Sequence, residues 1–128
     1  MTAPKPLKPL KPLSPLAREI YRQLVKHLRM RQHSITYGEL AAAVAPKIAT
    51  HPRSSRLHAA LGEVTVACRD RALPILPAMV WRTDSRRPSH GYFTVAHPRA
   101  RTDETRRAAW EREHDRVVRD AECYPRSL

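Results

Sequence analysis

Residues 35–76 constrain the fold of this chain most strongly, because their pattern predicts two helices flanked by short strands. Thr36 and Glu39 form a T-x-x-E capping box, in which each side chain accepts a hydrogen bond from a backbone amide at a helix start. After a loop at residues 45–52, one apolar face of a second, longer helix is formed by Leu57, Leu61, Val64 and Cys68. Two short helices in a basic chain predict a helix-turn-helix.

The excess of positive charge predicts a polyanionic partner. The chain has 128 residues, with 24 Lys and Arg against 12 Asp and Glu, and a formal net charge of +12. Such a charge opposes compaction and favours binding to DNA, RNA or an acidic surface. No apolar run reaches the roughly 18–20 residues of a membrane span, and the N-terminal region lacks the apolar core of a signal peptide. We therefore expect a cytoplasmic protein, nucleoid-associated if it binds DNA, without a disulfide framework.

Residues 1–13 contain three successive Lys-Pro-Leu triplets, which place positive charge at Lys5, Lys8 and Lys11. Proline at every third position prevents a helix, so this segment is expected to be an extended or disordered arm. The arm either lies along phosphates or in a minor groove, as homeodomain arms do, or is a solvated tail without a specific role. The compact domain is expected at residues 14–123, and a frayed tail at residues 124–128.

Two further helices are expected outside the central stretch. Ser14 as N-cap and Pro15 in the first turn open a helix that should end near Arg31. The last helix should begin at Thr102 and carry on one face Trp110, His114, Val117 and Ala121. Trp110 is expected to pack against the hairpin or against the first helix.

The order of elements predicts an α+β fold of the winged helix-turn-helix type. The apolar run at residues 73–81 and the segment at residues 92–95 are expected to pair as the two strands of a β-hairpin. Residues 83–91 would form its basic tip, which is the wing. The domain then consists of a three-helix core, a hairpin wing and an extra C-terminal helix.

Two basic segments form the candidate DNA-binding surface. Arginines beside serines in the first turn of the long helix are unfavourable near the positive end of the helix dipole unless an anion binds there. The contacts expected on this helix are Arg53, Ser54, Ser55, Arg56, His58 and Arg69. The wing is expected to add Arg82, Arg86, Arg87 and His90. We expect these cations to gather on one side of the core, although an exposed basic turn and a solvated hairpin tip are the plainer interpretations.

No motif predicts catalysis, a metal or a cofactor. The spacings H-E-x-x-H, C-x-x-C and His-x-His are absent, and the carboxylates in the middle of the chain are scattered. Cys68 lies on the apolar face of the long helix, and Cys123 has no neighbour in sequence that resembles an activating base. We therefore expect a protein without enzymatic activity, metal or cofactor.

Several motifs occur in the order found in one DNA-repair family. A Ser-Pro pair opens an amphipathic helix, the run ITYGELA follows, Arg56 stands five residues before Leu61, and LPIL precedes a Gly-Tyr pair. In this order, residues 14–93 resemble the winged-helix domain of O6-alkylguanine-DNA alkyltransferases and alkyltransferase-like proteins. The resemblance implies that Tyr37 contacts DNA and helps to rotate a nucleotide out of the duplex, and that Arg56 fills the vacated base stack.

The chain departs from that family where the family carries its chemistry. Ala78 stands at the position of the alkyl-accepting cysteine, and Met79 and Val80 stand at those of the following histidine and arginine. Without a thiolate nucleophile, no alkyl group can be accepted. About seven extra residues between Leu61 and Leu73 add about two helical turns, which argues against an unchanged base pocket and against base flipping.

The sequence therefore predicts a non-enzymatic protein that binds double-stranded DNA through a winged helix and a basic arm, mainly by phosphate contacts. Two alternatives stay open. One is a protein-interaction adaptor or inhibitor that binds an acidic partner. The other is a small phage-defence or mobile-element nuclease or toxin, suggested by a looser likeness to small domains that combine Y-G-E-L-A with L-P-x-L.

Overall fold

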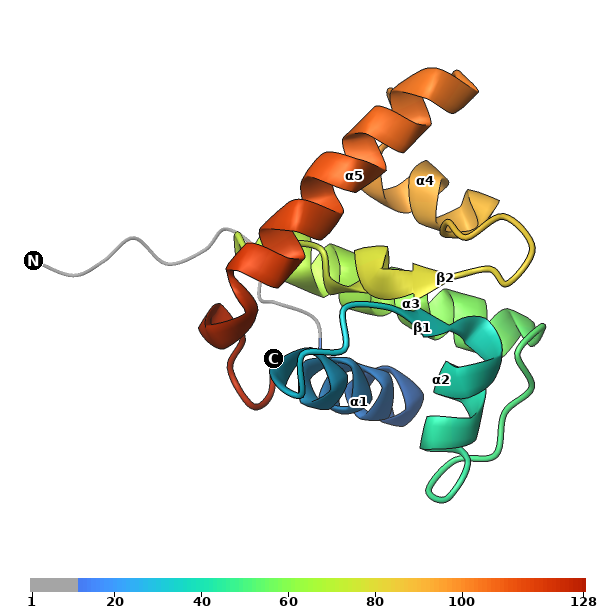
Figure 1. Ribbon diagram of the computed structural model, residues 1–128. Helices are drawn as coiled ribbons and strands as arrows, with labels where there is room; N and C mark the ends of the chain where they lie inside the picture. The colour runs from blue at the N-terminus through green and yellow to red at the C-terminus, as the bar shows by residue number, and fades with distance from the viewer. Residues whose placement is uncertain (1–11) are drawn as a thin grey trace, which may run out of the picture.

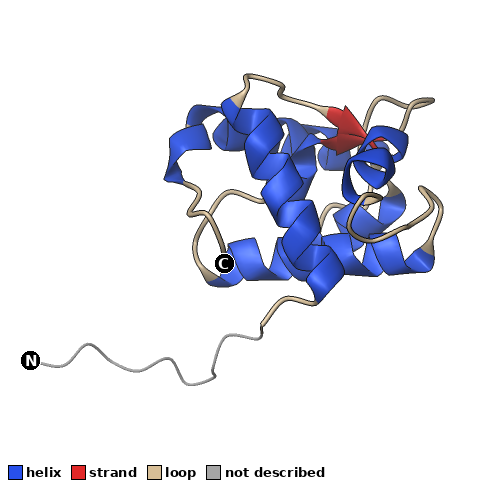
Figure 2. Ribbon diagram, turned by 90° about the horizontal axis from the view of Figure 1, so that it is seen from below, coloured by secondary structure: helices blue, strands red, loops and turns tan. Residues whose placement is uncertain are grey.

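Helices make up most of this fold, which a computed structural model describes for residues 12–128 (Figure 1). The α-helices of that range are α1 (Pro15–Arg29), α2 (Tyr37–Val44), α3 (Ser55–Asp70), α4 (His90–Ala96) and α5 (Asp103–Arg119). The strands and 3-10 helices are β1 (Ile35–Thr36), η1 (Leu76–Met79), β2 (Val80–Trp81) and η2 (Ala121–Cys123). Figure 2 shows the strands as one short pair among the helices.

The predicted helix starts are confirmed. Thr36 Oγ1 accepts a hydrogen bond from the Glu39 amide at 3.1 Å, and the Glu39 carboxylate accepts one from the Thr36 amide at 3.0 Å. Ser14, Ser54 and Thr102 accept comparable bonds at the starts of α1, α3 and α5. These side chains satisfy amides that have no partner within the helix, so each start is specified by residues close in sequence.

The core is built around α1, which packs against both α2 and α3. The face of α1 that contains Ile20 and Leu24 is fully buried, and so is the predicted face of α3 that contains Leu57, Val64 and Cys68. Each fully buried aliphatic side chain stabilises the fold by about 1.5–3 kcal/mol. The predicted periodicity of both helices is therefore correct.

The predicted hairpin wing is wrong. β2 pairs in parallel with β1, in the register Ile35 with Val80 and Thr36 with Trp81. Residues 92–95 lie in α4, whose buried Tyr92 and Phe93 pack toward α3. A run of four apolar or aromatic residues does not distinguish a strand from a short helix by its periodicity. The fold is thus helical with a small parallel sheet, and residues 82–89 form a loop where the wing was expected.

Residues 74–81 are held by side chains from the C-terminal part of the chain. Trp110 Nε1 donates a hydrogen bond to the Ala78 carbonyl at 2.8 Å, and Glu113 accepts one from the Ile75 amide at 2.8 Å. Tyr124 is buried, and its hydroxyl donates to the Pro74 carbonyl at 2.6 Å. The prediction of a frayed tail is therefore wrong at Tyr124, because an aromatic ring that finds an acceptor for its hydroxyl is stable when buried.

Two further expectations concern the N-terminal arm and membrane-spanning helices. Lys5, Lys8 and Lys11 of the predicted arm lie outside the described residues. Within residues 12–128, no helix combines the length and the apolar character needed to cross a membrane.

Candidate functional site

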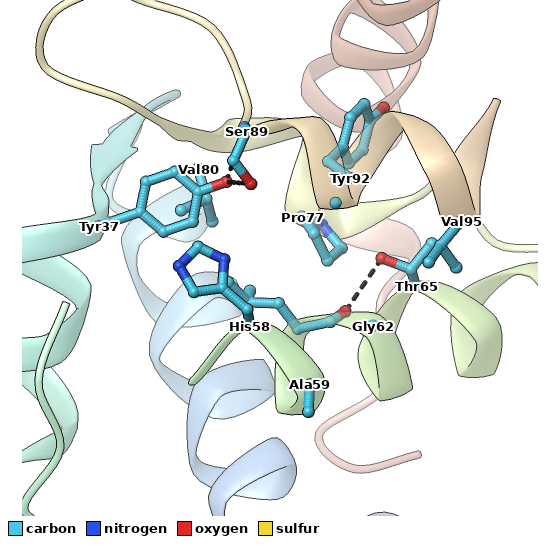
Figure 3. A pocket seen from close by; sticks show the side chains of 12 residues that line it. Tyr37, His58, Ala59, Gly62, Thr65, Pro77, Val80, Ser89, Tyr92 and Val95 are labelled. Carbon is cyan, nitrogen blue, oxygen red and sulfur yellow. Dashed lines mark hydrogen bonds between the residues drawn. The ribbon is translucent and has the colours of Figure 1, made fainter. Parts of the chain in front are cut away.

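Tyr37 joins three segments of the chain at one point (Figure 3). Its hydroxyl donates a hydrogen bond to Ser89 Oγ at 2.9 Å and accepts one from the Ser89 amide at 2.9 Å. Its ring stacks on the His58 ring, with centroids 5.1 Å apart and an interplanar angle of 28°. The start of α2, the start of α4 and the first turns of α3 are thereby fixed relative to one another.

A pocket of about 300 Å³ opens beside this cluster, between α3, α4 and the η1–β2 segment. Its wall is mostly apolar and includes Pro77, Val80 and Tyr92 (Figure 3). The Thr65 hydroxyl in the wall donates to the Leu61 carbonyl at 3.0 Å, so it is already satisfied. Polar groups therefore lie mainly at the mouth, where Tyr37 and Ser89 meet.

A larger and more polar cleft of about 600 Å³ shares Tyr37, His58 and Ser89 with the pocket. Arg53 lines it from the segment that precedes α3, and Arg82 and Asp84 line it from the loop after β2. The cleft is therefore an open site where cations stand beside an aromatic pair.

The predicted contacts of α3 lie at its two ends. Arg53 and Arg56 are exposed at the start of the helix, with exposed Ser55 and the N-cap Ser54 beside them. Neither arginine side chain has an ion-pair or hydrogen-bond partner among residues 12–128. Arg69 is about 20 Å further along the helix at 1.5 Å per residue, where it donates to the Val95 carbonyl. The structure thus groups Arg53 with Arg56 but not with Arg69.

The predicted wing cations are divided between the cleft and the start of α5. Arg86 is exposed on the loop and does not line the cleft. Arg87 is 3.0 Å from Asp103. His90 Nδ1 is 3.1 Å from Arg106 Nη1. Of the four predicted wing residues, only Arg82 therefore lines the cleft.

Asp84 is the one acidic side chain among the residues that line the cleft. Arg82 holds it with two hydrogen bonds of 3.1 and 2.8 Å, and the Ser85 amide donates a third at 2.7 Å. The hydrogen bonds from Arg82 and from the Ser85 amide lower the pKa of the Asp84 carboxyl. The cleft therefore contains a carboxylate that is already paired with Arg82.

Ser89 and Asp84 line the cleft but were not among the predicted site residues. A serine directly before a helix is a typical N-cap signal, but that interpretation requires recognising α4 first. No local pattern brings Asp84 toward Arg53, since the two residues meet only across the folded cleft.

The segment aligned with the alkyltransferase nucleophile is structural in this chain. Ala78 and Met79 are fully buried, and neither lines the pocket. The Ala78 carbonyl accepts hydrogen bonds from the indoles of both Trp110 and Trp81. Within the described range, no three His, Cys, Asp or Glu side chains lie close enough together to hold a metal ion.

No family model, no curated protein and no solved structure matches this chain. The resemblance of residues 14–93 to alkyltransferases therefore stays a prediction from motifs. The function has to be inferred from the geometry and charge of the site.

Proposed function

We propose that this protein binds double-stranded DNA without altering it chemically, through the start of α3 and residues 82–89. The observation that carries the proposal is the exposed pair Arg53 and Arg56, which has no anionic partner among the described residues. Two such cations at the positive end of a helix dipole destabilise the free protein. A phosphate bound there would interact favourably with both guanidinium groups and with the free amides of the first helical turn.

In this proposal, α2 and α3 act as a helix-turn-helix, and residues 82–89 take the place of a wing. Both helices pack on α1, which leaves the first turn of α3 exposed to a groove. Arg82 and Arg86 would then contact the phosphate backbone beside that groove. The arm with Lys5, Lys8 and Lys11 would add further phosphate contacts.

Tyr37 would form a rigid wall of the interface. It is held by two hydrogen bonds to Ser89 and by the stacked His58, so it loses little conformational freedom on binding. This arrangement favours contact with the shape of a duplex, in keeping with the resemblance that assigns Tyr37 a place against DNA.

Fluorescence anisotropy with a labelled 20-base-pair duplex at several salt concentrations tests the proposal. If about 6 phosphates are contacted, log affinity should fall against log salt with a slope of about −5. The double variant Arg53→Ala/Arg56→Ala should bind at least about ten-fold more weakly and reduce the slope by about 2.

The matched control is Arg107→Ala/Arg112→Ala on α5, which also removes two exposed positive charges outside the cleft. This control should change affinity by less than about three-fold. An equal loss in both double variants would show that only net charge matters, and would contradict the proposed surface.

A further inference from the structure

A second set of cations covers the outer face of α1, contrary to the expectation that the cations gather on one side. Figure 1 shows α1 below α3 and the strands, and α4 above them. The exposed cations of α1 are spaced four, four and three residues apart, at Arg18, Arg22, Lys26 and Arg29. The helix contains one acidic residue, Glu19, which pairs with Arg22 at 3.0 Å.

The helix dipole accounts for only part of this pattern. Cations in the last turn, such as Lys26 and Arg29, stabilise a helix. Arg18 stands in the first turn, where a cation is unfavourable. Arg126, from the C-terminal segment, comes to the same surface. A role outside the stability of α1 is therefore indicated.

Two hollows lie along this surface and meet at Arg22 and Arg126, which line both. The first has a volume of about 380 Å³, with Val25 and Met30 as its apolar part and Lys26 and Arg29 at its rim. The second has a volume of about 330 Å³, and its apolar lining includes Leu13, Tyr21 and Ile48. The surface thus alternates apolar depressions with positive charge.

Met30 gives this surface its apolar character. Its exposed fraction is 61%, and Val66 is the other large hydrophobic residue that is exposed in the part of the chain that the structure describes. Methionine and arginine are both enriched where proteins contact one another, because methionine adapts to irregular shapes and arginine forms forked hydrogen bonds. A lone exposed methionine has no such meaning, but Met30 lines the same hollow as Arg22, Lys26, Arg29 and Arg126.

We infer that this surface, the α1 groove of Arg18, Arg22, Val25, Lys26, Met30 and Arg126, docks an acidic protein segment that carries apolar anchor residues. Carboxylates of the partner would pair with Lys26 and Arg126, neither of which has an ion-pair partner among the residues placed by the structure. An apolar side chain of the partner would cover the exposed Met30, which lines the hollow together with the buried Val25.

Charge excludes two other occupants of the groove. A second copy of this chain carries a net charge of +12, and residues 1–11 of the chain contain three lysines and no acid, so both would be repelled. A nucleic-acid backbone has the right sign, but it offers no apolar group to cover Met30. The 15 residues of α1 span about 22 Å, which a partner helix of similar length or an extended segment of about seven residues would match.

Two cations are already held in place, Arg22 within the groove and Arg29 beside it. Arg29 Nη2 donates a hydrogen bond to the Tyr124 carbonyl at 2.9 Å, which fixes the guanidinium without neutralising it. Arg22 is positioned by its ion pair with Glu19, whose carboxylate is shared with Lys47. Cations that are held in place lose less side-chain freedom when a partner binds.

The test uses a fluorescein-labelled helical peptide of about 16 residues, with leucines along one face and glutamates on the others, titrated onto the full chain. We expect saturable binding that weakens at least about ten-fold in Lys26→Gln/Arg126→Gln and in Met30→Ser. A peptide with its leucines replaced by serine should bind at least about ten-fold more weakly. Because these side chains are exposed, the unfolding midpoint should stay that of the wild type.

The matched control is Arg53→Ala/Arg56→Ala, which also removes two positive charges and should leave peptide affinity within about two-fold. Duplex DNA should show the reverse: its affinity should fall in Arg53→Ala/Arg56→Ala and should change little in Lys26→Gln/Arg126→Gln. A peptide affinity that does not change when Lys26 and Arg126, or the leucines of the peptide, are replaced would overturn the inference. So would a loss of DNA affinity in Lys26→Gln/Arg126→Gln as large as in Arg53→Ala/Arg56→Ala, because the groove would then belong to the nucleic-acid surface.

Discussion

Residues 74–81 and residues 82–89 follow one another in the chain but are held in opposite ways. The first segment is buried, and its backbone is bound by Glu113, Trp110 and Tyr124. The second is largely exposed, and its hydrogen bonds to the rest of the fold run mainly through Ser89 and Tyr37. The difference teaches that two segments that are neighbours in sequence can serve different ends. Residues 74–81 belong to the scaffold that stabilises the fold, and residues 82–89 belong to the candidate binding site. Substitutions in the first segment should change stability, and substitutions in the second should change binding.

The buried segment needs distant partners because of its own composition. Pro74 and Pro77 lack backbone donors, and only two residues of the segment pair in a strand. Buried backbone groups that find no partner cost free energy comparable to a lost hydrogen bond. Side chains of α5 and of the C-terminal segment therefore supply the missing partners.

The largest effect is expected for Glu113→Ala. The carboxylate of this buried residue accepts the Ile75 amide, so the substitution leaves a buried donor unsatisfied. The free energy of unfolding should fall by about 2–4 kcal/mol, measured by urea denaturation. Glu113→Gln keeps an acceptor oxygen and should lose less. A loss below about 0.5 kcal/mol in Glu113→Ala would contradict the claim that the bonds to residues 74–81 stabilise the fold.

A smaller effect is expected for Tyr124→Phe. This change keeps the ring and deletes only the hydroxyl that donates to the Pro74 carbonyl. The free energy of unfolding should fall by about 1–2 kcal/mol. Amide hydrogen exchange should rise in residues 74–81 more than in residues 82–89. Equal protection loss in both segments would show that they unfold as one unit.

Alkaline pH should probe Tyr21, a buried tyrosine of α1 that packs edge-to-face on Tyr124. Burial raises the pKa of Tyr21 to about 12 from its ordinary value of 10.0, and its hydroxyl donates to the Pro125 carbonyl. Because the folded pKa is higher than the unfolded one, this contribution is complete below pH 10 and is lost as pH rises toward 12. Tyr21→Phe should be about 1 kcal/mol less stable than the wild type at pH 8, and the difference should narrow above pH 10. A constant difference from pH 8 to 11 would contradict this linkage.

The same contrast explains what the sequence predicts and what it does not. The Thr36–Glu39 box and the caps at Ser14 and Ser54 involve partners within three residues, so local patterns identify them. The site pair Tyr37–Ser89 joins residues 52 positions apart, and no periodicity indicates it. Arg53 and Arg56 were predicted by charge, but their isolation from anions required the fold.

Within the candidate site, Tyr37→Phe should affect binding more than stability. The variant loses both hydrogen bonds to Ser89 but keeps the ring stacked on His58. The free energy of unfolding should fall by less than about 1 kcal/mol, since the site is partly solvated. DNA affinity should fall about three- to ten-fold, because a ring held only by stacking on His58 forms a less rigid wall. A stability loss as large as that of Glu113→Ala would place Tyr37 in the scaffold.

The smallest effect on stability is expected for Asp84→Asn. Unlike Tyr37→Phe, this substitution should strengthen DNA binding. Asp84 and Arg82 form an exposed pair, and such pairs contribute little to stability, so the unfolding midpoint should not move. The carboxylate lies in the cleft beside Arg53 and competes with any incoming phosphate for Arg82. Removing its charge should therefore raise duplex affinity about two- to five-fold at low salt, with a smaller gain at high salt. Asp115→Asn on α5 changes the net charge equally outside the cleft, and should raise affinity less. Equal gains in the two variants would mean that residues 82–89 do not lie against the phosphates. The binding site would then lie in another part of the molecule, and residues 74–81 and 82–89 would not differ as scaffold and site.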